Sequence, residues 1–216
     1  IVTDADRASE RLIVERLRAA FPRATILGEE TGTHEGADDE RWIVDPLDGT
    51  TNYAHDYPFY CVAIAYERTS KVVAGVIYAP AMDECFSASL GSGAFLNGRR
   101  IGVSSIARLS DALACTGFRP SDFRRNARAF EAVSDRAQAV RRDGSAALDL
   151  AYVACGRFDG FWERDLQPWD VAAGTLIVRE AGGTVTQIDG SAPKVDSGSI
   201  LATNGRVHAE MIEVLT

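Results

Sequence analysis

The segment WIVDPLDGT at residues 42–50 constrains this chain more than any other. It is apolar until it reaches Asp45, which is the pattern of a buried strand that surfaces at a functional edge. The proline that follows fixes the backbone, and the glycine after Asp48 permits a tight reversal. We therefore expect both carboxylates to point into one cavity, beside the backbone N–H groups of Gly49 and Thr50. The alternative is an ordinary polar turn before a capped helix.

Two further acids favour the functional interpretation of this turn. Glu29 stands in the triplet GEE, and Asp170 stands in the run PWDVAAGTLIVREAGG. Together with Asp45 and Asp48 they describe a place where divalent cations are held against a phosphate. Mg²⁺ prefers oxygen ligands, keeps several waters and shares its coordination shell with substrate phosphate. Taken alone, Asp170 is equally an acid near a helix N-terminus, which contributes a few tenths to ~1 kcal/mol.

These motifs resemble those of the inositol monophosphatase family, which belongs to the Mg²⁺-dependent, lithium-sensitive phosphatases. WIVDPLDGTTNY resembles the first family signature and PWDVAAGTLIVREAGG the second. GEE and the opening VTDAD match in type and order, and the likeness extends through GAFLNGRRI and RRDGSAALDLAY. The resemblance implies an α+β fold, a layered αβαβα sandwich of the sugar-phosphatase type, and helices and sheets alternate along the chain accordingly. We expect one domain over residues 1–216, without the N-terminal segment that family members usually carry before this point.

The resemblance also implies a set of metal ligands. In the family pattern Glu29, Asp45 and the backbone carbonyl of Leu47 hold a first Mg²⁺, while Asp45, Asp48 and Asp170 hold a second. The expected cofactor is therefore Mg²⁺, with two or three ions in the site. Two such cations neutralise the phosphate, polarise an attacking water and stabilise the leaving alkoxide. The sequence accordingly has neither a G-x-S-x-G elbow nor a Cys-His signature for a covalent nucleophile.

Three further residues receive catalytic or supporting roles from the resemblance, besides the catalytic ligand Glu29. Thr50 helps to deprotonate or orient the attacking water, and Asp6 supports Thr50. Glu30 adds negative charge near the metals. The alternative, purely structural interpretations are that Thr50 is a capping hydroxyl and that Thr3 and Asp6 form a capping box at the start of a helix.

The substrate side of the site is also given by the resemblance. Backbone donors of Gly144, Ser145 and Ala146 meet substrate oxygens at the start of a helix. Glu163 matches a position that contacts polyol hydroxyls, although it also fits a surface acid at the end of a strand. The expected substrate-binding set is completed by Asp48, Gly49, Thr50 and Asp170.

Composition narrows the class of protein. The net charge of -8 and a pI near 4.9 argue against direct binding to nucleic acid, which needs a basic face. No apolar run approaches the ~18 residues of a membrane span, so no membrane contact is expected. The cysteines stand in apolar runs without a C-x-x-C pair, which is typical of buried thiols in a reducing compartment such as the cytoplasm: Cys61, Cys85, Cys115 and Cys155.

The sequence leaves two classes of function open. The first is a Mg²⁺-dependent phosphomonoesterase acting on inositol 1-phosphate or a related small phosphate ester. Histidinol phosphate, fructose 1,6-bisphosphate and 3′-phosphoadenosine phosphate remain alternative substrates, because the motifs describe the phosphate and not the leaving group. The second is a regulatory protein that binds RNA-processing or transcription machinery, although the intact carboxylate set favours catalysis. The resemblance implies a homodimer.

The secondary structure expected from periodicity and turn signals follows the same layered order. Helices are expected from Thr3 to the residue before Pro22, over 123–138 with an exposed face, over 146–155 in the core, from 168 to the residue before Gly182, and from Val207. A surface loop is expected over 31–40. Strands are expected at 25–27, 41–45, 60–67, 71–79, 84–89, 94–96, 158–163, 184–188 and 199–203.

Overall fold

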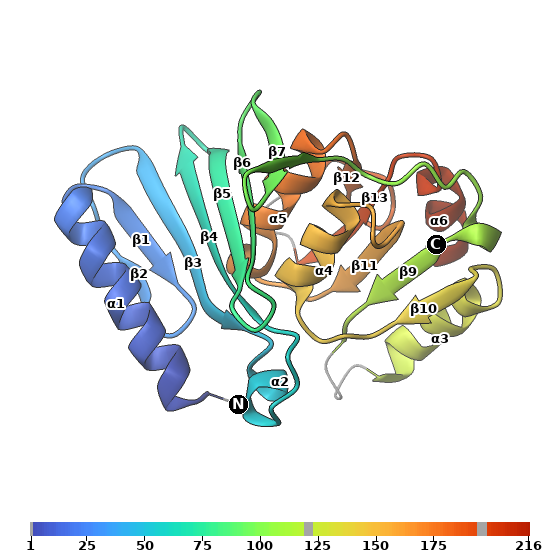
Figure 1. The fold of residues 1–216 in the computed structure, drawn as a ribbon, viewed down its shortest axis with the longest axis horizontal. Helices are drawn as coiled ribbons and strands as arrows, with labels where there is room; N and C mark the ends of the chain where they lie inside the picture. The colour runs from blue at the N-terminus through green and yellow to red at the C-terminus, as the bar shows by residue number, and fades with distance from the viewer. Residues whose placement is uncertain (1, 119–122, 194–197) are drawn as a thin grey trace.

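The computed structural model describes residues 2–118, 123–193 and 198–216, which form five layers. Helix α1 covers one face of a first sheet, and helices α4 and α5 lie between that sheet and a second one (Figure 1). Helices α3 and α6 pack on the outer face of the second sheet. This order confirms the predicted αβαβα sandwich. In the described part of the chain no helix has the length and apolar character to cross a membrane.

The first sheet has eight strands in the order β2-β1-β3-β4-β5-β6-β7-β8. Strands β1 and β3 run parallel, and the other neighbours are antiparallel. The strand bounds are β1 Thr25–Gly28, β2 Gly32–His34, β3 Glu40–Asp48, β4 Cys61–Arg68, β5 Lys71–Ala79, β6 Glu84–Ser89, β7 Gly93–Leu96 and β8 Arg99–Ile101.

The second sheet has five strands in the order β10-β9-β11-β13-β12. Strands β10, β9 and β11 are parallel, and β13 runs antiparallel to β11 and β12. The strand bounds are β9 Leu113–Thr116, β10 Ala139–Arg141, β11 Gly160–Arg164, β12 Thr184–Thr186 and β13 Ser199–Thr203.

The helices begin where capping signals stand in the sequence. At the start of α1 the side chain of Thr3 and that of Asp6 form the predicted capping box. Helix α5 begins with Pro168, and Asp170 accepts a hydrogen bond from the backbone of Gln167. The helix bounds are α1 Asp4–Ala20, α2 Thr50–Ala54, α3 Phe123–Ser134, α4 Ala146–Ala154, α5 Pro168–Glu180 and α6 His208–Leu215, with a 3₁₀ turn at Leu109–Asp111.

The middle layer is packed closely enough to exclude side chains at two glycines. A Cβ on Gly75 of β5 would lie 3.0 Å from the Cα of Ala173 in α5. A Cβ on Gly174 would lie 2.5 Å from Cδ1 of Leu150 in α4. One hydrophobic cluster runs from the first sheet through α4 and α5 to the second sheet. Helix α5 is thereby fixed against both of its neighbours.

Most predicted elements are confirmed, with boundaries that differ by a few residues, but three expectations were wrong. The predicted loop at 31–40 contains β2, which pairs with β1 through the backbone and has no apolar alternation to announce it. The predicted strand 41–45 continues to Asp48 through a bulge. Helix α3 ends at Ser134 rather than at 138, because the chain then turns to hydrogen-bond Ala112 and enters β10.

Candidate active site

The register of the parallel pair β1 and β3 brings the first two acids together. Gly28 is paired with Val44, so Glu29 and Asp45 follow directly at the same edge of the sheet. The Glu29 N–H donates to the Val44 carbonyl at 3.2 Å, and the Glu29 and Asp45 side chains lie close enough for Asp45 to influence the pKa of Glu29. This edge also holds the start of α1 and the short helix α2, and it is the lower edge in Figure 1.

The turn after Asp45 arranges its own acids. The Leu47 N–H donates to Oδ1 of Asp45 at 3.0 Å, and Asp45 is buried. Oδ2 of Asp48 accepts 2.7 Å hydrogen bonds from the Ser145 hydroxyl and from the Ala147 N–H. Asp48 thus ties this turn to the start of α4. Of the predicted substrate loop, Ser145 thus directs its hydroxyl at Asp48 in this structure.

Burial and crowding raise the pKa values of these acids. Burial raises the pKa of Glu29 to about 7, although its hydrogen bond with Asp45 opposes the rise. Burial raises the pKa of Asp45 well above its ordinary value, and the charges that add to the rise are those of Asp48, Glu29 and Asp170. Burial also raises the pKa of Asp48, against the hydrogen bond from Ser145. These carboxylates are close enough to repel one another, which places Asp170 in the same group.

The donor set suits a hard divalent cation. All of the side-chain atoms that could bind a metal here are carboxylate oxygens. A cation between them would relieve the repulsion between the carboxylates. Within the described ranges no three acidic, histidine or cysteine side chains already converge on one point as metal ligands. The ligand roles of Glu29, Asp45, Leu47, Asp48 and Asp170 therefore stay predictions.

Thr50 and Asp6 are in direct contact. The Thr50 hydroxyl lies 3.0 Å from Oδ1 of Asp6 and 3.0 Å from the Leu47 carbonyl oxygen, and it can donate to either. The other oxygen of Asp6 accepts from the N–H and the hydroxyl of Thr3. Asp6 therefore has its capping role and its contact with Thr50 at the same time, so the two interpretations do not exclude each other.

The start of α4 is held in place by Asn52 of α2, which the sequence analysis did not single out. Its side-chain amide donates to the carbonyls of Phe59 and Asp143, each at 2.7 Å. Gly144 follows with φ +88°, a conformation that favours glycine. Asn52 lies within the motif TTNY, directly after the turn that carries Asp45 and Asp48. An amide side chain at that position was the sequence feature that could have indicated its role.

A second acidic group is centred on Asp149, a residue of α4 itself. Asp149 is buried, and neither of its carboxylate oxygens has a hydrogen-bond partner among the described residues. Burial raises its pKa well above the ordinary value, and the charges of Asp143 and Glu163 add to the rise. The Glu163 carboxylate lies over Gly117, where a Cβ would stand 2.1 Å from it. Glu163 thus faces the interior group that contains Asp149, and its predicted contact with substrate stays untested.

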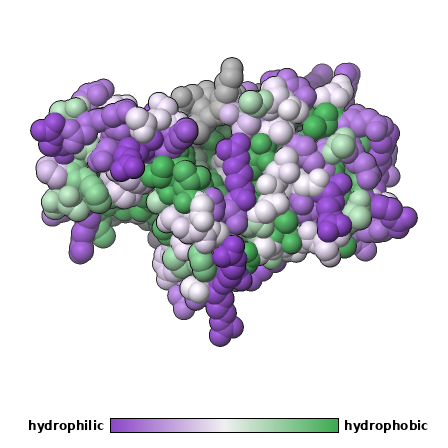
Figure 2. Space-filling view, turned by 90° about the horizontal axis from the view of Figure 1, so that it is seen from above, coloured by the Kyte–Doolittle hydropathy of each residue, from purple (hydrophilic) through white to green (hydrophobic). Residues whose placement is uncertain are grey.

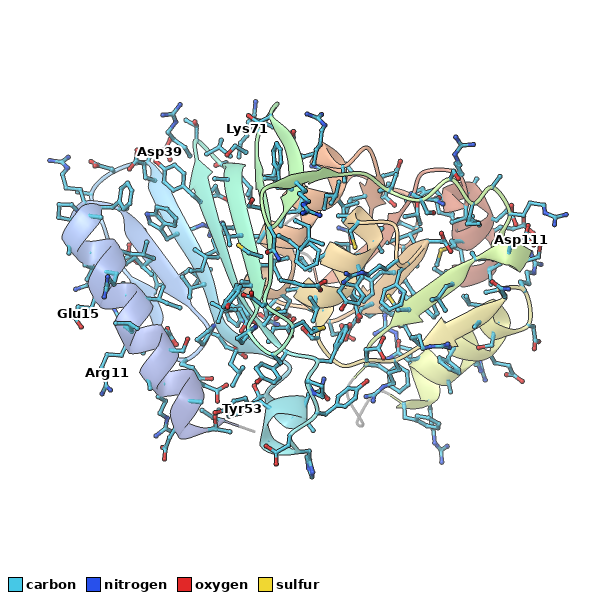
Figure 3. The ribbon with its side chains drawn as sticks, in the orientation of Figure 1. Arg11, Glu15, Asp39, Tyr53, Lys71 and Asp111 are labelled. Atoms are coloured by element: carbon cyan, nitrogen blue, oxygen red, sulfur yellow. The ribbon has the colours of Figure 1, made fainter. Side chains whose placement is uncertain are left out.

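The opposite edge of the molecule carries a separate cleft of about 770 Å³, lined in part by Asp39, Arg41, Lys71 and Arg179. Figure 3 shows Asp39 and Lys71 at this upper edge and Tyr53 of α2 at the lower one. Hydrophilic side chains project across the upper face from both ends and along its middle (Figure 2). The cleft mixes charges of both signs and lies away from the carboxylate group.

Comparison with known proteins identifies the family. A model described as the inositol monophosphatase family matches residues 1–215. The chain belongs to this family. It is 47% identical to the inositol-1-monophosphatase of Rhizobium meliloti (strain 1021), over 99% of this chain and 82% of that protein. The predicted membership is confirmed, and the protein is a phosphatase.

Solved structures and other members of the family agree with this. The structure of inositol monophosphatase from Anabaena (Nostoc) sp. PCC 7120 has a TM-score of 0.95, with 48% identity over 99% of this chain and 86% of that one. A structure of SaIMPase-II with inositol monophosphate bound has a TM-score of 0.86, with 27% identity over 97% of this chain and 86% of that one. A putative Nus factor SuhB of Neisseria meningitidis serogroup B is 43% identical, over 100% of this chain and 84% of that protein.

Proposed function

We propose that this phosphatase is a Mg²⁺-dependent phosphomonoesterase that hydrolyses inositol 1-phosphate or a related small phosphate ester with water as the nucleophile. The observation that carries the proposal is the group of four mutually repelling carboxylates at the ends of β1 and β3 and the start of α5. The names of the Rhizobium and Anabaena relatives, and the inositol monophosphate bound in the SaIMPase-II structure, support the substrate class.

The residues would divide the work in the following way. Glu29, Asp45 and the Leu47 carbonyl would hold one Mg²⁺. Asp45, Asp48 and Asp170 would hold a second, so Asp45 would bind both ions. Bound Mg²⁺ supplies Lewis acidity, which neutralises phosphate charge and makes water a better nucleophile. Each carboxylate must be ionised to act as a ligand, and the raised pKa values of Glu29, Asp45 and Asp48 oppose this until a cation binds.

The Thr50 hydroxyl would orient the attacking water. It can accept a hydrogen bond from water while it donates to Oδ1 of Asp6, 3.0 Å away. That arrangement leads a proton from the water, through the Thr50 oxygen, toward a buried carboxylate. On the other side, Gly144, Ser145 and Ala146 at the start of α4 would face substrate oxygens, and Glu163 would contact a polyol hydroxyl.

The test is hydrolysis of a panel of phosphate esters by the metal-free protein, with and without added Mg²⁺. The panel contains inositol 1-phosphate, histidinol phosphate, fructose 1,6-bisphosphate and 3′-phosphoadenosine phosphate. We expect Mg²⁺-dependent phosphate release with inositol 1-phosphate as the best substrate. Equal release without Mg²⁺ in the presence of a chelator would refute the metal requirement, and a better substrate elsewhere in the panel would replace inositol 1-phosphate.

A second candidate role is favoured by one comparison. The Neisseria relative is named as a putative Nus factor, so we propose as the second candidate that this chain binds transcription or RNA-processing proteins, with no direct contact to nucleic acid. Pull-down with the wild-type protein and with Asp45→Asn separates the two roles. Retention of such partners by the inactive variant supports a binding role, and their absence from both samples refutes it.

Three further properties belong to the same proposal. We infer inhibition by lithium, a homodimer and a cytoplasmic location. The four free cysteines support a reducing compartment. Exposed apolar side chains on β5, Val76 and Tyr78, permit a subunit interface. Light scattering at micromolar concentration measures the mass, and a monomer would refute the dimer.

A further inference from the structure

Glu10 is a buried acid on α1 that the proposed mechanism does not use. It has 0% exposure, and its carboxylate receives three hydrogen bonds from the turn after β1. Oε2 accepts from the Glu30 N–H at 2.9 Å. Oε1 accepts from the Thr31 N–H at 3.2 Å and from the Thr31 hydroxyl at 2.6 Å. A carboxylate is suited to this place because all three partners are donors.

These bonds anchor the backbone on one side of Glu29, and β3 anchors it on the other. The N–H of Glu29 itself donates to the Val44 carbonyl, and the next two N–H groups donate to Glu10. A Cβ on Gly28 would lie 1.8 Å from Oε1 of Glu10. The Glu10 carboxylate therefore lies directly against the residue before Glu29. The backbone at Glu29 cannot shift without breaking one of these contacts.

The same face of α1 also holds the last residues of β3 and the start of α2. Asp6, Ser9 and Glu10 are spaced at i, i+3 and i+4, so their side chains lie on one side of the helix. Asp6 accepts from Thr50, and the Ser9 hydroxyl donates to the Pro46 carbonyl at 2.9 Å. Side chains on one face of α1 thus contact both the segment after β1 that carries Glu29 and the end of β3 that carries Asp45 and Asp48.

We propose that Glu10 is a positioning residue, which fixes Glu29 relative to Asp45 and thereby sets the affinity of the site for a divalent cation. The inference rests on the proposed metal-dependent function. Groups that orient metal ligands typically change metal affinity or activity by about 10–100-fold when they are replaced. A merely structural Glu10 would change stability and leave cation affinity unaltered.

The main test uses Glu10→Gln in the full chain, because glutamine keeps the size of the side chain but presents an NH₂ group to N–H donors. Calorimetric titration of metal-free protein gives the dissociation constant for Mg²⁺, and the Mg²⁺ dependence of hydrolysis gives a second measure. We expect Mg²⁺ binding to weaken by about 10–100-fold, with KM for the phosphate ester at saturating Mg²⁺ unchanged. Glu15→Gln is the matched control, since Glu15 is an exposed acid on the same helix, labelled in Figure 3.

Two further variants keep the test decisive if Glu10→Gln does not fold. Thr31→Val removes one of the three hydrogen bonds and should weaken Mg²⁺ binding by roughly fivefold. Gly28→Ala pushes against Oε1 of Glu10 and should act in the same direction. Mg²⁺ affinity equal to wild type in the folded variants overturns the proposal, even where the melting temperature falls.

The outcome also separates this inference from the proposed function. Weaker Mg²⁺ binding in the variants of a wild-type protein that hydrolyses no phosphate ester would refute the function and leave the positioning role standing. A wild-type protein that hydrolyses esters, with variants of unchanged Mg²⁺ affinity, would refute the positioning role alone. A wild-type protein that binds no Mg²⁺ overturns both.

Discussion

Replacing Asp149 by asparagine should stabilise the protein at neutral pH. Asp149 is 1% exposed and neither carboxylate oxygen has a partner among the described residues. Burial raises its pKa well above the ordinary value, so between the unfolded and the folded pKa the folded protein keeps this carboxyl protonated. The unfolded chain releases the proton above pH ~4. The free energy of unfolding of the wild-type protein is therefore highest below that pH. It falls as the pH rises toward the pKa of Asp149 in the folded protein.

The size of the effect follows from proton linkage. Each pH unit between the unfolded and the folded pKa costs about 1.4 kcal/mol of unfolding free energy. Asparagine has the same shape and carries no proton, so it removes this slope. Above pH ~4 the advantage of Asp149→Asn over wild type should grow by about 1.4 kcal/mol per pH unit, and it should level off where the folded carboxyl ionises.

Urea unfolding of both proteins between pH 4.5 and 8 measures this difference. A chelator is present in both samples, so metal binding does not contribute to the difference between them. Asp135→Asn is the control, because Asp135 is exposed on the surface after α3. A difference between Asp149→Asn and wild type that stays constant within about 0.5 kcal/mol over this range would refute the neutral buried acid.

Three further predictions concern catalysis. Asp45→Asn should abolish turnover because this carboxylate would bridge both cations, and its loss should exceed that of Thr50→Ala; near-wild-type kcat at saturating Mg²⁺ would falsify the two-metal arrangement. Lithium at millimolar concentration should slow phosphate release by occupying the cation position beside Asp170, and an Mg²⁺-dependent enzyme indifferent to lithium would belong to another branch of the superfamily. Glu163→Ala should lower kcat/KM for inositol 1-phosphate by a factor that corresponds to about 1–3 kcal/mol of transition-state stabilisation, and it should lower kcat/KM for glycerol 2-phosphate less. An equal fall in kcat/KM for both substrates would show that Glu163 has a structural role.

The elements that carry the site were predictable because their signals are local. The apolar run that ends at Asp45 is the strand β3, and the capping residues at Thr3 and Pro168 mark the starts of α1 and α5. Side-chain periodicity, proline and capping hydroxyls act over a few residues, so one sequence is enough to read them.

The contacts that hold the site together were not predictable in the same way. Glu10 stands in a polar stretch of α1 and looks like a surface acid, since its partners Glu30 and Thr31 are 20 and 21 positions away. Strand β2 has three residues without apolar alternation and exists because β1 offers a free backbone edge. Asp149 did have a signal, because it is the single charge in the run AALDLAYVA.

The close packing of α5 has a consequence for the choice of ion. Asp170 comes from the middle layer, whereas Glu29 and Asp45 come from the first sheet, so the spacing between those two layers sets the gap between the proposed ligands. Alanine at Gly75 would push Ala173 of α5 away by a few tenths of an ångström. Mg²⁺–oxygen and Ca²⁺–oxygen distances, at roughly 2.1 and 2.4 Å, differ by about that amount. The contact between Gly75 and Ala173 therefore helps to set how closely Asp170, one helical turn before Ala173, approaches the carboxylates of the first sheet.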